Sequence, residues 1–122
     1  MAWTFNTKGA LFLQIEDRMR REIVNGKYAP DQQIPSVRQL AYEASVNPNT
    51  MQKALSLLEE EGLLYTKGTL GRFVTSNPEV IQRAKEKILW EAVRGWICEA
   101  KDLGLALEDM IDFIKREGKK NE

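Results

Sequence analysis

The stretch that decides the fold is residues 34–74, IPSVRQLAYEASVNPNTMQKALSLLEEEGLLYTKGTLGRFV. Near its start, Ser36 and Gln39 form a capping box, in which the serine hydroxyl accepts from a backbone N–H and the glutamine reaches back. A helix of about two turns is therefore predicted from Val37. Its apolar residues recur at i, i+3, i+4 and i+7, as expected of a face packed on a core. They are Val37, Leu40, Ala41 and Ala44.

A second helix is predicted to begin at Pro48. Asn47 is a favoured N-cap residue, and proline suits the first helical position because its missing N–H would have no partner there. After the acidic run 59–61, Gly62 can take the positive φ that closes a helix. Five apolar residues mark the buried side: Met51, Ala54, Leu55, Leu57 and Leu58. Two short helices around a tight turn predict a helix-turn-helix.

A small hairpin is predicted after the second helix. Residues 63–66 and 72–75 have strand character, and residues 67–71, KGTLG, form a glycine-rich tip between them. Backbone N–H groups at such a tip can approach phosphates closely. The hairpin therefore predicts a wing.

The residues that open the second helix are polar, and they suit DNA. Asparagine and glutamine can pair with adenine in the major groove, threonine can touch a thymine methyl or a phosphate, and lysine neutralises phosphate. These residues are Asn49, Thr50, Gln52 and Lys53. The alternative is an ordinary solvated helix start, and the wing that follows favours DNA binding.

Three motifs in this order resemble the winged helix-turn-helix of the GntR superfamily of bacterial transcription regulators: PSVRQLA, VNPNTMQKALSLLEEEGLL and GTLGRFV. With the preceding helix the resemblance covers residues 12–74, and the NPNT start with its short helical tail resembles the YtrA-type subfamily. Together with the chemistry above, the resemblance implies DNA contacts at Ser36, Arg38, Asn47, Pro48, Asn49, Thr50, Gln52, Lys53, Gly68 and Thr69.

Two departures from the family pattern matter. Many relatives carry arginine where this chain has Pro48 and Gln52, which implies a different base preference and a weaker electrostatic grip. The family wing has Gly-Thr directly before Phe-Val, whereas here residues 70–72 separate Thr69 from Phe73.

Composition excludes several classes of protein. The 122 residues suffice for one domain and an appendage, but not for a second ligand-binding domain of ordinary size. With no histidine and one cysteine, Cys98, the usual zinc sites, histidine-based catalysis and an internal disulfide are excluded. We expect no metal, no cofactor and no enzyme activity. Cys98 is expected to be a small buried hydrophobe, with a redox sensor as the alternative.

Charge and hydropathy set further expectations. Lysine plus arginine equals aspartate plus glutamate, 18 each, which argues against a strongly basic DNA binder and predicts moderate, salt-dependent affinity. The basic face is predicted to hold Arg38, Lys53, Lys67 and Arg72, with Lys8, Arg18, Arg20 and Arg21 adding to it. Neither a bilayer-spanning run nor a secretory leader is recognised, so a cytoplasmic protein without a membrane partner is expected.

Helices are also predicted on both sides of this stretch. Residues 11–24 form one, ended by Asn25-Gly26; residues 78–103 form a long one, ended by Gly104; and residues 107–117 form the last, before a frayed end at 118–122. The fold class is therefore mainly α, a winged helix-turn-helix domain of three helices and a β-hairpin over residues 1–76, followed by a two-helix dimerisation segment over residues 77–122.

The apolar belt of the long helix is wider than one stripe, and a single short companion cannot cover it. A second subunit is the simplest cover, and the expected dimer interface is Ile88, Ala92, Val93, Trp96 and Ile97. The alternative is a monomer whose tail folds back on the winged domain. Trp90, Trp96 and Phe113 are expected in a core, although they could line a cleft for an effector of unknown identity.

These patterns predict a homodimeric transcription regulator, a repressor, that binds an inverted-repeat operator in double-stranded DNA. The resemblance implies control of a nearby operon, often one for transport. The alternative is a winged-helix scaffold for protein assembly that does not touch DNA.

Overall fold

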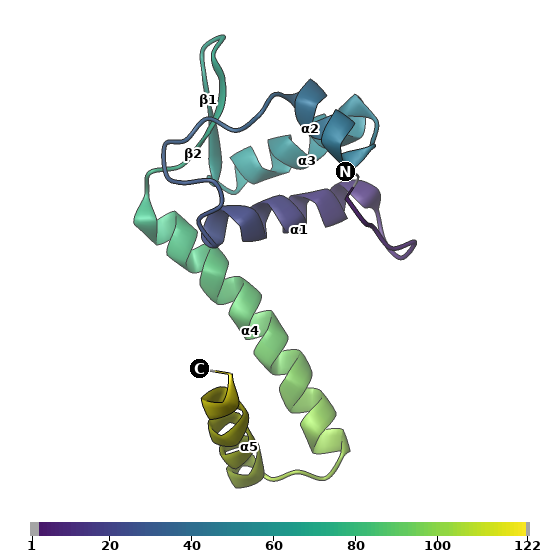
Figure 1. Cartoon of the computed structure of the whole chain (residues 1–122), viewed down its shortest axis with the longest axis vertical. Helices are drawn as coiled ribbons and strands as arrows, with labels where there is room; N and C mark the ends of the chain where they lie inside the picture. Colours follow the sequence, from purple (N-terminus) through teal and green to yellow (C-terminus); the bar gives the residue numbers. More distant parts are fainter. Residues whose placement is uncertain (1–2, 122) are drawn as a thin grey trace. The chain divides into compact units, whose positions relative to one another are not determined.

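The computed structural model describes residues 3–121 and is mainly helical, with one two-stranded antiparallel sheet (Figure 1). In chain order the elements are α1 (Leu11–Val24), α2 (Val37–Ala44), α3 (Pro48–Glu60), β1 (Leu64–Lys67), β2 (Gly71–Val74), α4 (Pro78–Asp102) and α5 (Leu107–Lys120). The predicted winged-helix fold is confirmed. Contacts group the chain into two compact units, a winged unit that ends at Lys85 and a tail unit that begins at Glu86.

The core of the winged unit lies where α1, α2 and α3 meet, with α3 in contact with both other helices. Its largest fully buried side chains come from all three helices and from the wing: Ile15, Met19, Leu40, Met51, Leu55, Leu58, Leu63 and Val74. Burying each of them contributes about 1.5–3 kcal/mol of hydrophobic free energy. Trp3 and Phe5 pack against this core, whereas Leu57, predicted to be buried, is only half-buried.

Side chains cap α2 and α3 as the sequence predicted. Ser36 Oγ accepts from the Gln39 N–H at 3.1 Å, and Asn47 Oδ1 accepts from the Asn49 N–H at 2.7 Å. One half of the predicted capping box differs, because the Gln39 amide donates to Glu43 at 3.3 Å along the helix and does not return to Ser36. The serine hydroxyl alone therefore caps α2.

Both helices end in a left-handed residue. Ser45, with φ +57°, closes α2 and lets the Val46 N–H donate to the Ala41 carbonyl at 3.0 Å. Gly62, with φ +83°, does the same for α3, where the Leu63 N–H reaches the Leu58 carbonyl at 3.0 Å. These Schellman closures set the direction in which the chain leaves each helix.

Both wing strands are shifted by one residue from the prediction. β1 lies one residue later in the chain than predicted, and β2 lies one residue earlier. The register runs from Leu64↔Val74 to Lys67↔Gly71, which leaves residues 68–70 as the tip. Leu63 falls outside β1 because its N–H closes α3, although its carbonyl still accepts from the Thr75 N–H at 2.9 Å.

The first turns of α4 belong to the winged unit, where Val80, Ile81 and Ala84 pack against its core. In the tail unit, the rest of α4 ends at Asp102, one residue before the predicted end, and a turn at Leu103 and Gly104 leads to α5. The last helix continues to Lys120, three residues beyond the predicted end, because Gly118 is accommodated within it and Lys120 pairs with Glu117 at 3.3 Å. Of the predicted frayed end, Glu122 lies outside the described residues.

Little of the tail unit is buried: of its described residues only Ala100 and Met110 are. Cys98, expected to be buried, is exposed in the single chain because little of the tail unit covers this part of α4, where residues 91–95 and Glu99 are exposed as well. No described helix combines the length and apolar character that crossing a bilayer requires.

Candidate nucleic-acid interface

The start of α3 presents polar side chains to solvent. Pro48, Asn49, Gln52 and Lys53 are exposed and Thr50 is half-buried, because Met51, Ala54 and Leu55 turn the opposite face into the core. Within residues 3–121 the Asn49 side-chain amide makes no hydrogen bond, so its donors and its acceptor remain available.

Two of the predicted contact residues on α3 also have roles inside the protein. The Asn47 side chain is engaged in the cap of α3, which leaves its N–H₂ group to interact outward. The Lys53 ammonium lies 3.9 Å from the centre of the Phe12 ring, and this cation–π contact holds the lysine stem against α1.

The start of α2 adds a free cation next to the cap. Arg38 is exposed and has no ion-pair partner among the described residues. Neighbouring Ser36 is exposed too, but its oxygen already accepts from Gln39. Arg38 is therefore the residue of α2 best able to neutralise a phosphate.

The wing is tied to the end of α3 through one carboxylate. Glu59 Oε1 accepts from the Thr66 hydroxyl at 2.7 Å and from Arg72 Nε at 2.5 Å, and Arg72 also donates to Gln52 Oε1 at 3.5 Å. Burial alone would raise the pKa of Glu59, but the hydrogen bonds from Thr66 and Arg72 outweigh it, so the pKa is lowered. Glu59 stays ionised and keeps Arg72 in place.

The residues before α2 also pair with the wing. The Ile34 N–H donates to the Arg72 carbonyl at 3.0 Å, and the Val74 N–H donates to the Gln32 carbonyl at 2.9 Å. The Gln33 side chain continues this pairing and donates from Nε2 to the Leu70 carbonyl at 2.5 Å. The wing is therefore flanked by a third extended segment.

A groove of about 290 Å³ lies between the start of α2, the solvent face of α3 and the wing. Its polar lining comes from all three parts: Gln33, Ser36, Gln52, Thr66 and Arg72. The structure thus brings two predicted site residues, Ser36 and Gln52, to one groove. Gly68 and Thr69 lie at the exposed wing tip beyond it.

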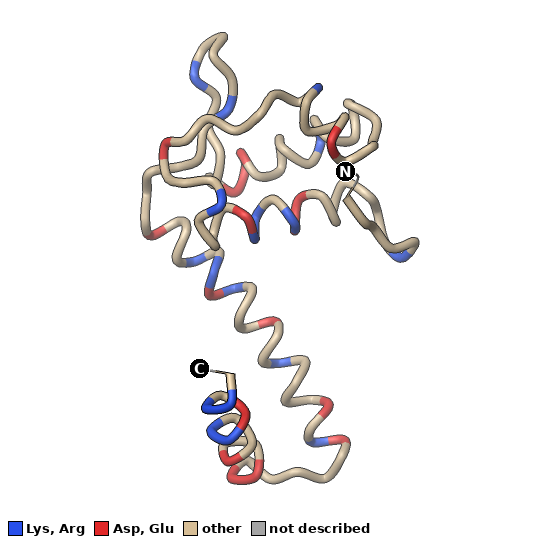
Figure 2. The backbone as a smooth tube through the Cα atoms, viewed as in Figure 1, with Lys and Arg blue, Asp and Glu red and all other residues tan. Residues whose placement is uncertain are grey.

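The basic face is smaller than the sequence predicted. Arg72 is compensated by Glu59, and its side chain is only 16 % exposed. The three arginines of α1 are compensated as well, because Arg18 pairs with Glu22, Arg20 with Glu16 and Glu61, and Arg21 with Asp17. Figure 2 shows these alternating charges along α1. Among the described residues of this predicted basic face, those that make no ion pair are Lys8, Arg38, Lys53 and Lys67.

Sequence reasoning missed Glu59 and Gln33, side chains that bond to the wing from outside the hairpin, as it missed Asp31, which accepts from the Tyr65 hydroxyl at 2.9 Å. Glu59 belongs to an acidic run that resembles a solvated helix end, and Gln33 precedes α2 in a polar stretch without strand periodicity. The alternation of Gln33 and buried Ile34 is the one local signal of extended pairing.

Comparison with known proteins agrees with this geometry. The family model described as bacterial regulatory proteins, gntR family, matches residues 11–74, which span α1 to the end of the wing. The HTH-type transcriptional repressor YtrA of Bacillus subtilis is 31% identical over 119 residues, with 92% of each chain covered. A solved GntR family transcriptional regulator from Listeria monocytogenes superposes with a TM-score of 0.85, at 31% identity, over 92% of this chain and 98% of that one.

A further solved structure is similar to the winged unit and contains DNA. It is the DNA-binding domain of AraR in complex with operator ORX1, which matches with a TM-score of 0.55 and 28% identity over 62% of this chain and 95% of that chain. The similarity places the candidate interface on a fold that binds an operator in that relative.

Proposed function

The chain belongs to the gntR family of bacterial regulatory proteins, and from that premise we propose that it is a homodimeric transcriptional repressor that binds an inverted-repeat operator. Membership of this family shows that the chain is a transcription regulator. The proposal adds that it is a repressor, that it is a dimer and that its operator is an inverted repeat. Support for repression comes from the similar YtrA, which is itself named a repressor.

One observation carries DNA recognition: the free, exposed Asn49 amide lies at the start of α3. With Gln52 one turn further along and Arg38 on α2, it offers base-edge donors and acceptors beside a phosphate-neutralising cation. This is the combination that a recognition helix needs in a major groove, where amides distinguish bases and cations supply affinity. We therefore assign base contacts to Asn49 and Gln52, with Pro48 and Thr50 beside them, and phosphate contacts to Arg38 and Lys53. Ser36, Asn47, Gly68 and Thr69 complete the proposed DNA surface.

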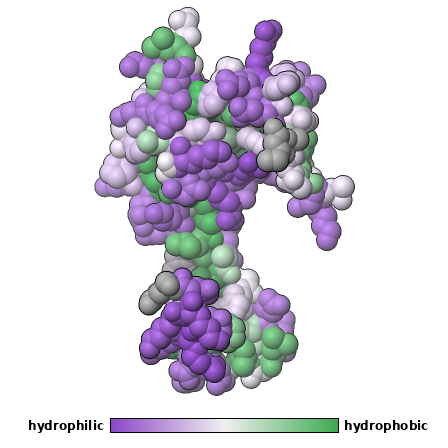
Figure 3. Space-filling model, in the orientation of Figure 1, coloured by the Kyte–Doolittle hydropathy of each residue, from purple (hydrophilic) through white to green (hydrophobic). Residues whose placement is uncertain are grey.

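The tail unit supports a dimer because it leaves so much apolar surface uncovered. Nine of its large apolar side chains are exposed: Leu89, Trp90, Val93, Leu103, Leu105, Leu107, Ile111, Phe113 and Ile114. Figure 3 shows apolar residues, in green, at the surface of this unit. None of the five proposed interface residues is buried within the chain. A second copy that covers Ile88, Ala92, Val93, Trp96 and Ile97 would remove an apolar patch of the kind that marks interfaces.

A dimer also suits the target. Two recognition helices related by a two-fold axis match two half-sites about one helical turn, ~34 Å, apart. The proposed target is the promoter of a nearby operon, with transport genes the first to test, and the site of action is the cytoplasm, where bacterial DNA lies.

Fluorescence anisotropy titration tests the proposal directly. Duplexes from the region upstream of the chain's own gene and scrambled duplexes of equal length are titrated at about 50 and 200 mM salt. We expect tighter binding to one upstream duplex, by about 10³-fold or more over the scrambled one, with affinity that falls as salt rises. Sedimentation of the free protein is expected to give a dimer.

Equal, weak binding to all duplexes would contradict the proposal that the chain is a repressor with its own operator. A dimer without specific DNA binding would favour the second candidate, a winged-helix scaffold for protein assembly. A monomer that binds half and full operators equally would exclude the dimeric form of the proposal.

A further inference from the structure

The Gln33 side chain connects the segment before α2 to the tip of the wing. Its main chain is bridged to Phe73 of β2, and its Nε2 donates to the Leu70 carbonyl at 2.5 Å. A Cβ added to Gly71 would lie 3.0 Å from Gln33 Nε2, and Gly71 has φ +123°. The wing backbone therefore approaches the amide closely, and the positive φ of Gly71 disfavours any residue with a Cβ at this position.

This contact matters because a two-stranded hairpin is at best marginally stable by itself. At the base of the wing, Glu59 binds Thr66 and Arg72. At the tip, a backbone turn joins the Leu70 N–H to the Lys67 carbonyl at 3.0 Å, and the Gln33 amide ties this turn to the body of the winged unit. Without the amide, residues 68–70 would be anchored only through their own strands.

We propose that Gln33 is a positioning residue for DNA recognition, which holds the wing tip in its DNA-contacting position before DNA arrives. The proposal rests on the proposed function. Thr69 of the proposed DNA surface is exposed at the tip, and we add its neighbour Leu70, which is 62 % exposed, to that surface. Both side chains meet the duplex in this proposal, while Gln33 acts through them. Fixing a loop in its bound conformation improves affinity because less conformational entropy is lost on binding.

The test uses two variants that remove the donor. Gln33→Met keeps the length and lacks the N–H₂ group, and Gln33→Glu places a carboxylate opposite the Leu70 carbonyl. The matched control is Gln32→Glu, because Gln32 Oε1 accepts from the Ala29 N–H at 2.8 Å and a carboxylate can accept equally well. The probe is a duplex that the wild-type chain selects from a random-sequence library.

Both Gln33 variants are expected to bind this duplex about five- to ten-fold more weakly, the equivalent of one lost hydrogen bond, and Gln32→Glu to bind within about two-fold of wild type. Amide hydrogen exchange at residues 68–71 should be faster in the Gln33 variants, with the melting temperature little changed. In a Thr69→Ala, Leu70→Ala background, Gln33→Met should cause no further loss of affinity.

Gln33 variants that bind as wild type does would overturn the proposal, and so would an undiminished effect in the double-alanine background. If the wild-type chain selects no sequence, the proposed function itself fails and the positioning role with it. The exchange data then still show whether the amide holds the tip.

Discussion

At the scale of single residues, carboxylates of the winged unit form ion pairs with several of its own arginines. Glu59 holds Arg72, and Glu61 pairs with Arg20 across α3 and α1. Burial alone would lower the pKa of Arg20, but the bond and charge of Glu61, with Glu16 and Asp17, raise it, so the guanidinium stays charged. In the winged unit much of the charge balance thus reflects internal pairing, and the described cations of its predicted basic face that make no ion pair lie before α1, on α2, on α3 and in the wing.

The first prediction separates base reading from phosphate binding. Asn49→Ala should relax preference at one operator position by about 1–3 kcal/mol, because its free amide is proposed to contact a base edge. Arg38→Ala should weaken specific and random duplexes alike and reduce the salt slope by about one unit. Anisotropy titrations on single-base operator variants at several salt concentrations check both. An equal loss on specific and random DNA for Asn49→Ala would show that it does not read a base.

The second prediction concerns acid. The folded-state pKa of Glu59 lies below its ordinary value of 4.5, so the stability that this carboxylate contributes is present above that value and is lost as pH falls through the folded pKa. Glu59→Gln should therefore cost roughly 0.2–1 kcal/mol at pH 7 and show a shallower loss of stability below about pH 4.5. Urea denaturation across this range measures both effects.

Glu60→Gln is the matched control for this substitution. Glu60 makes no ion pair within the described residues, so its substitution removes a charge from the same acidic run and should leave the stability at pH 7 close to that of wild type. Parallel pH profiles for wild type and Glu59→Gln would mean that the Glu59–Arg72 contact does not stabilise the fold.

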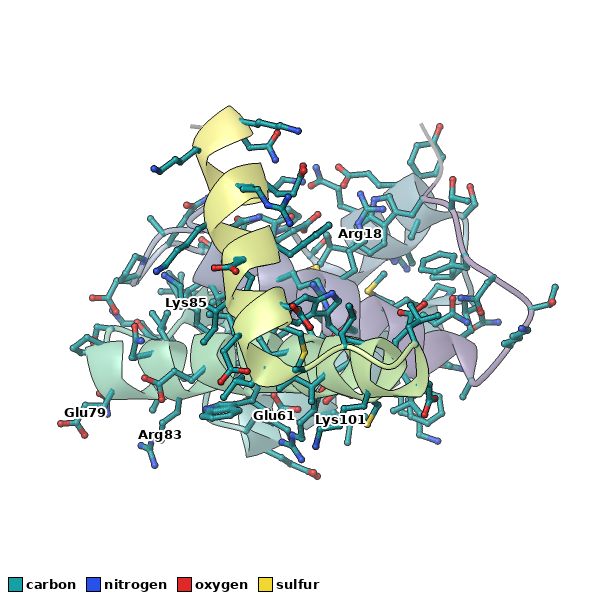
Figure 4. All side chains as sticks on the ribbon, turned by 90° about the horizontal axis from the view of Figure 1, so that it is seen from below. Arg18, Glu61, Glu79, Arg83, Lys85 and Lys101 are labelled. Carbon is teal, nitrogen blue, oxygen red and sulfur yellow. The ribbon has the colours of Figure 1, made fainter. Side chains whose placement is uncertain are left out.

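At the scale of elements, the sequence predicts helix bounds that depend on neighbouring residues, and it does not predict contacts between residues far apart in the chain. The bounds of α1 and the first residues of α2, α3 and α4 follow from caps, prolines and periodicity, which act within a few residues. The same local patterning explains α4, where Val80 and Ala84 face the core while Glu79 and Arg83 project outward (Figure 4).

The pairing of residues 31–34 with β2 could not be predicted from the sequence, because strand pairing over about forty residues leaves little local trace. The left-handed Ser45 was missed for a related reason: helix closure favours glycine there, and serine gives no such signal. Of the candidate site, the polar start of α3 was predictable, whereas the compensation of Arg72 depends on a contact between separate elements.

The third prediction tests the closure of α3. Gly62→Ala should destabilise the winged unit by about 1–2 kcal/mol, because φ +83° is unfavourable for a residue with a Cβ. Steric overlap is not the cause of this loss, because the added Cβ would lie 3.8 Å from Val80 Cγ1, an ordinary van der Waals contact. Gly118→Ala, inside α5, is the control and should leave the melting temperature unchanged or slightly raised. A Gly62→Ala protein as stable as wild type would contradict this explanation.

At the scale of the whole molecule, burial is distributed unevenly. The winged unit holds a continuous core, from Ile15 on α1 to Val74 on β2. Of the described residues of the tail unit, only Ala100 and Met110 are buried. A unit with two buried residues lacks the hydrophobic free energy to hold its own structure, so its stability is expected to depend on association.

The fourth prediction follows from that difference. Val93→Glu should convert the proposed dimer to a monomer, because the 44 % exposed side chain would carry an unpaired charge into the interface. Binding to a two-half-site operator should then fall by about 10²-fold or more, while binding to a half-site changes little. Sedimentation and titration on full and half operators measure the two effects.

Lys101→Glu changes a charge at an exposed position of the same helix and should leave the dimer intact. If the Val93→Glu protein sediments as wild type does, the dimer interface must lie elsewhere on the tail unit.

The exposed thiol on α4 has a practical consequence. Cys98 is the one cysteine in the sequence, and its side chain is accessible, so a maleimide spin label or dye attaches at a defined point without removing other thiols. Two associated copies would then carry two labels, and the dipolar coupling between them would report a single distance. Measuring that distance while operator duplex is added would report on the assembly of the two copies, in a chain that carries no change other than the label.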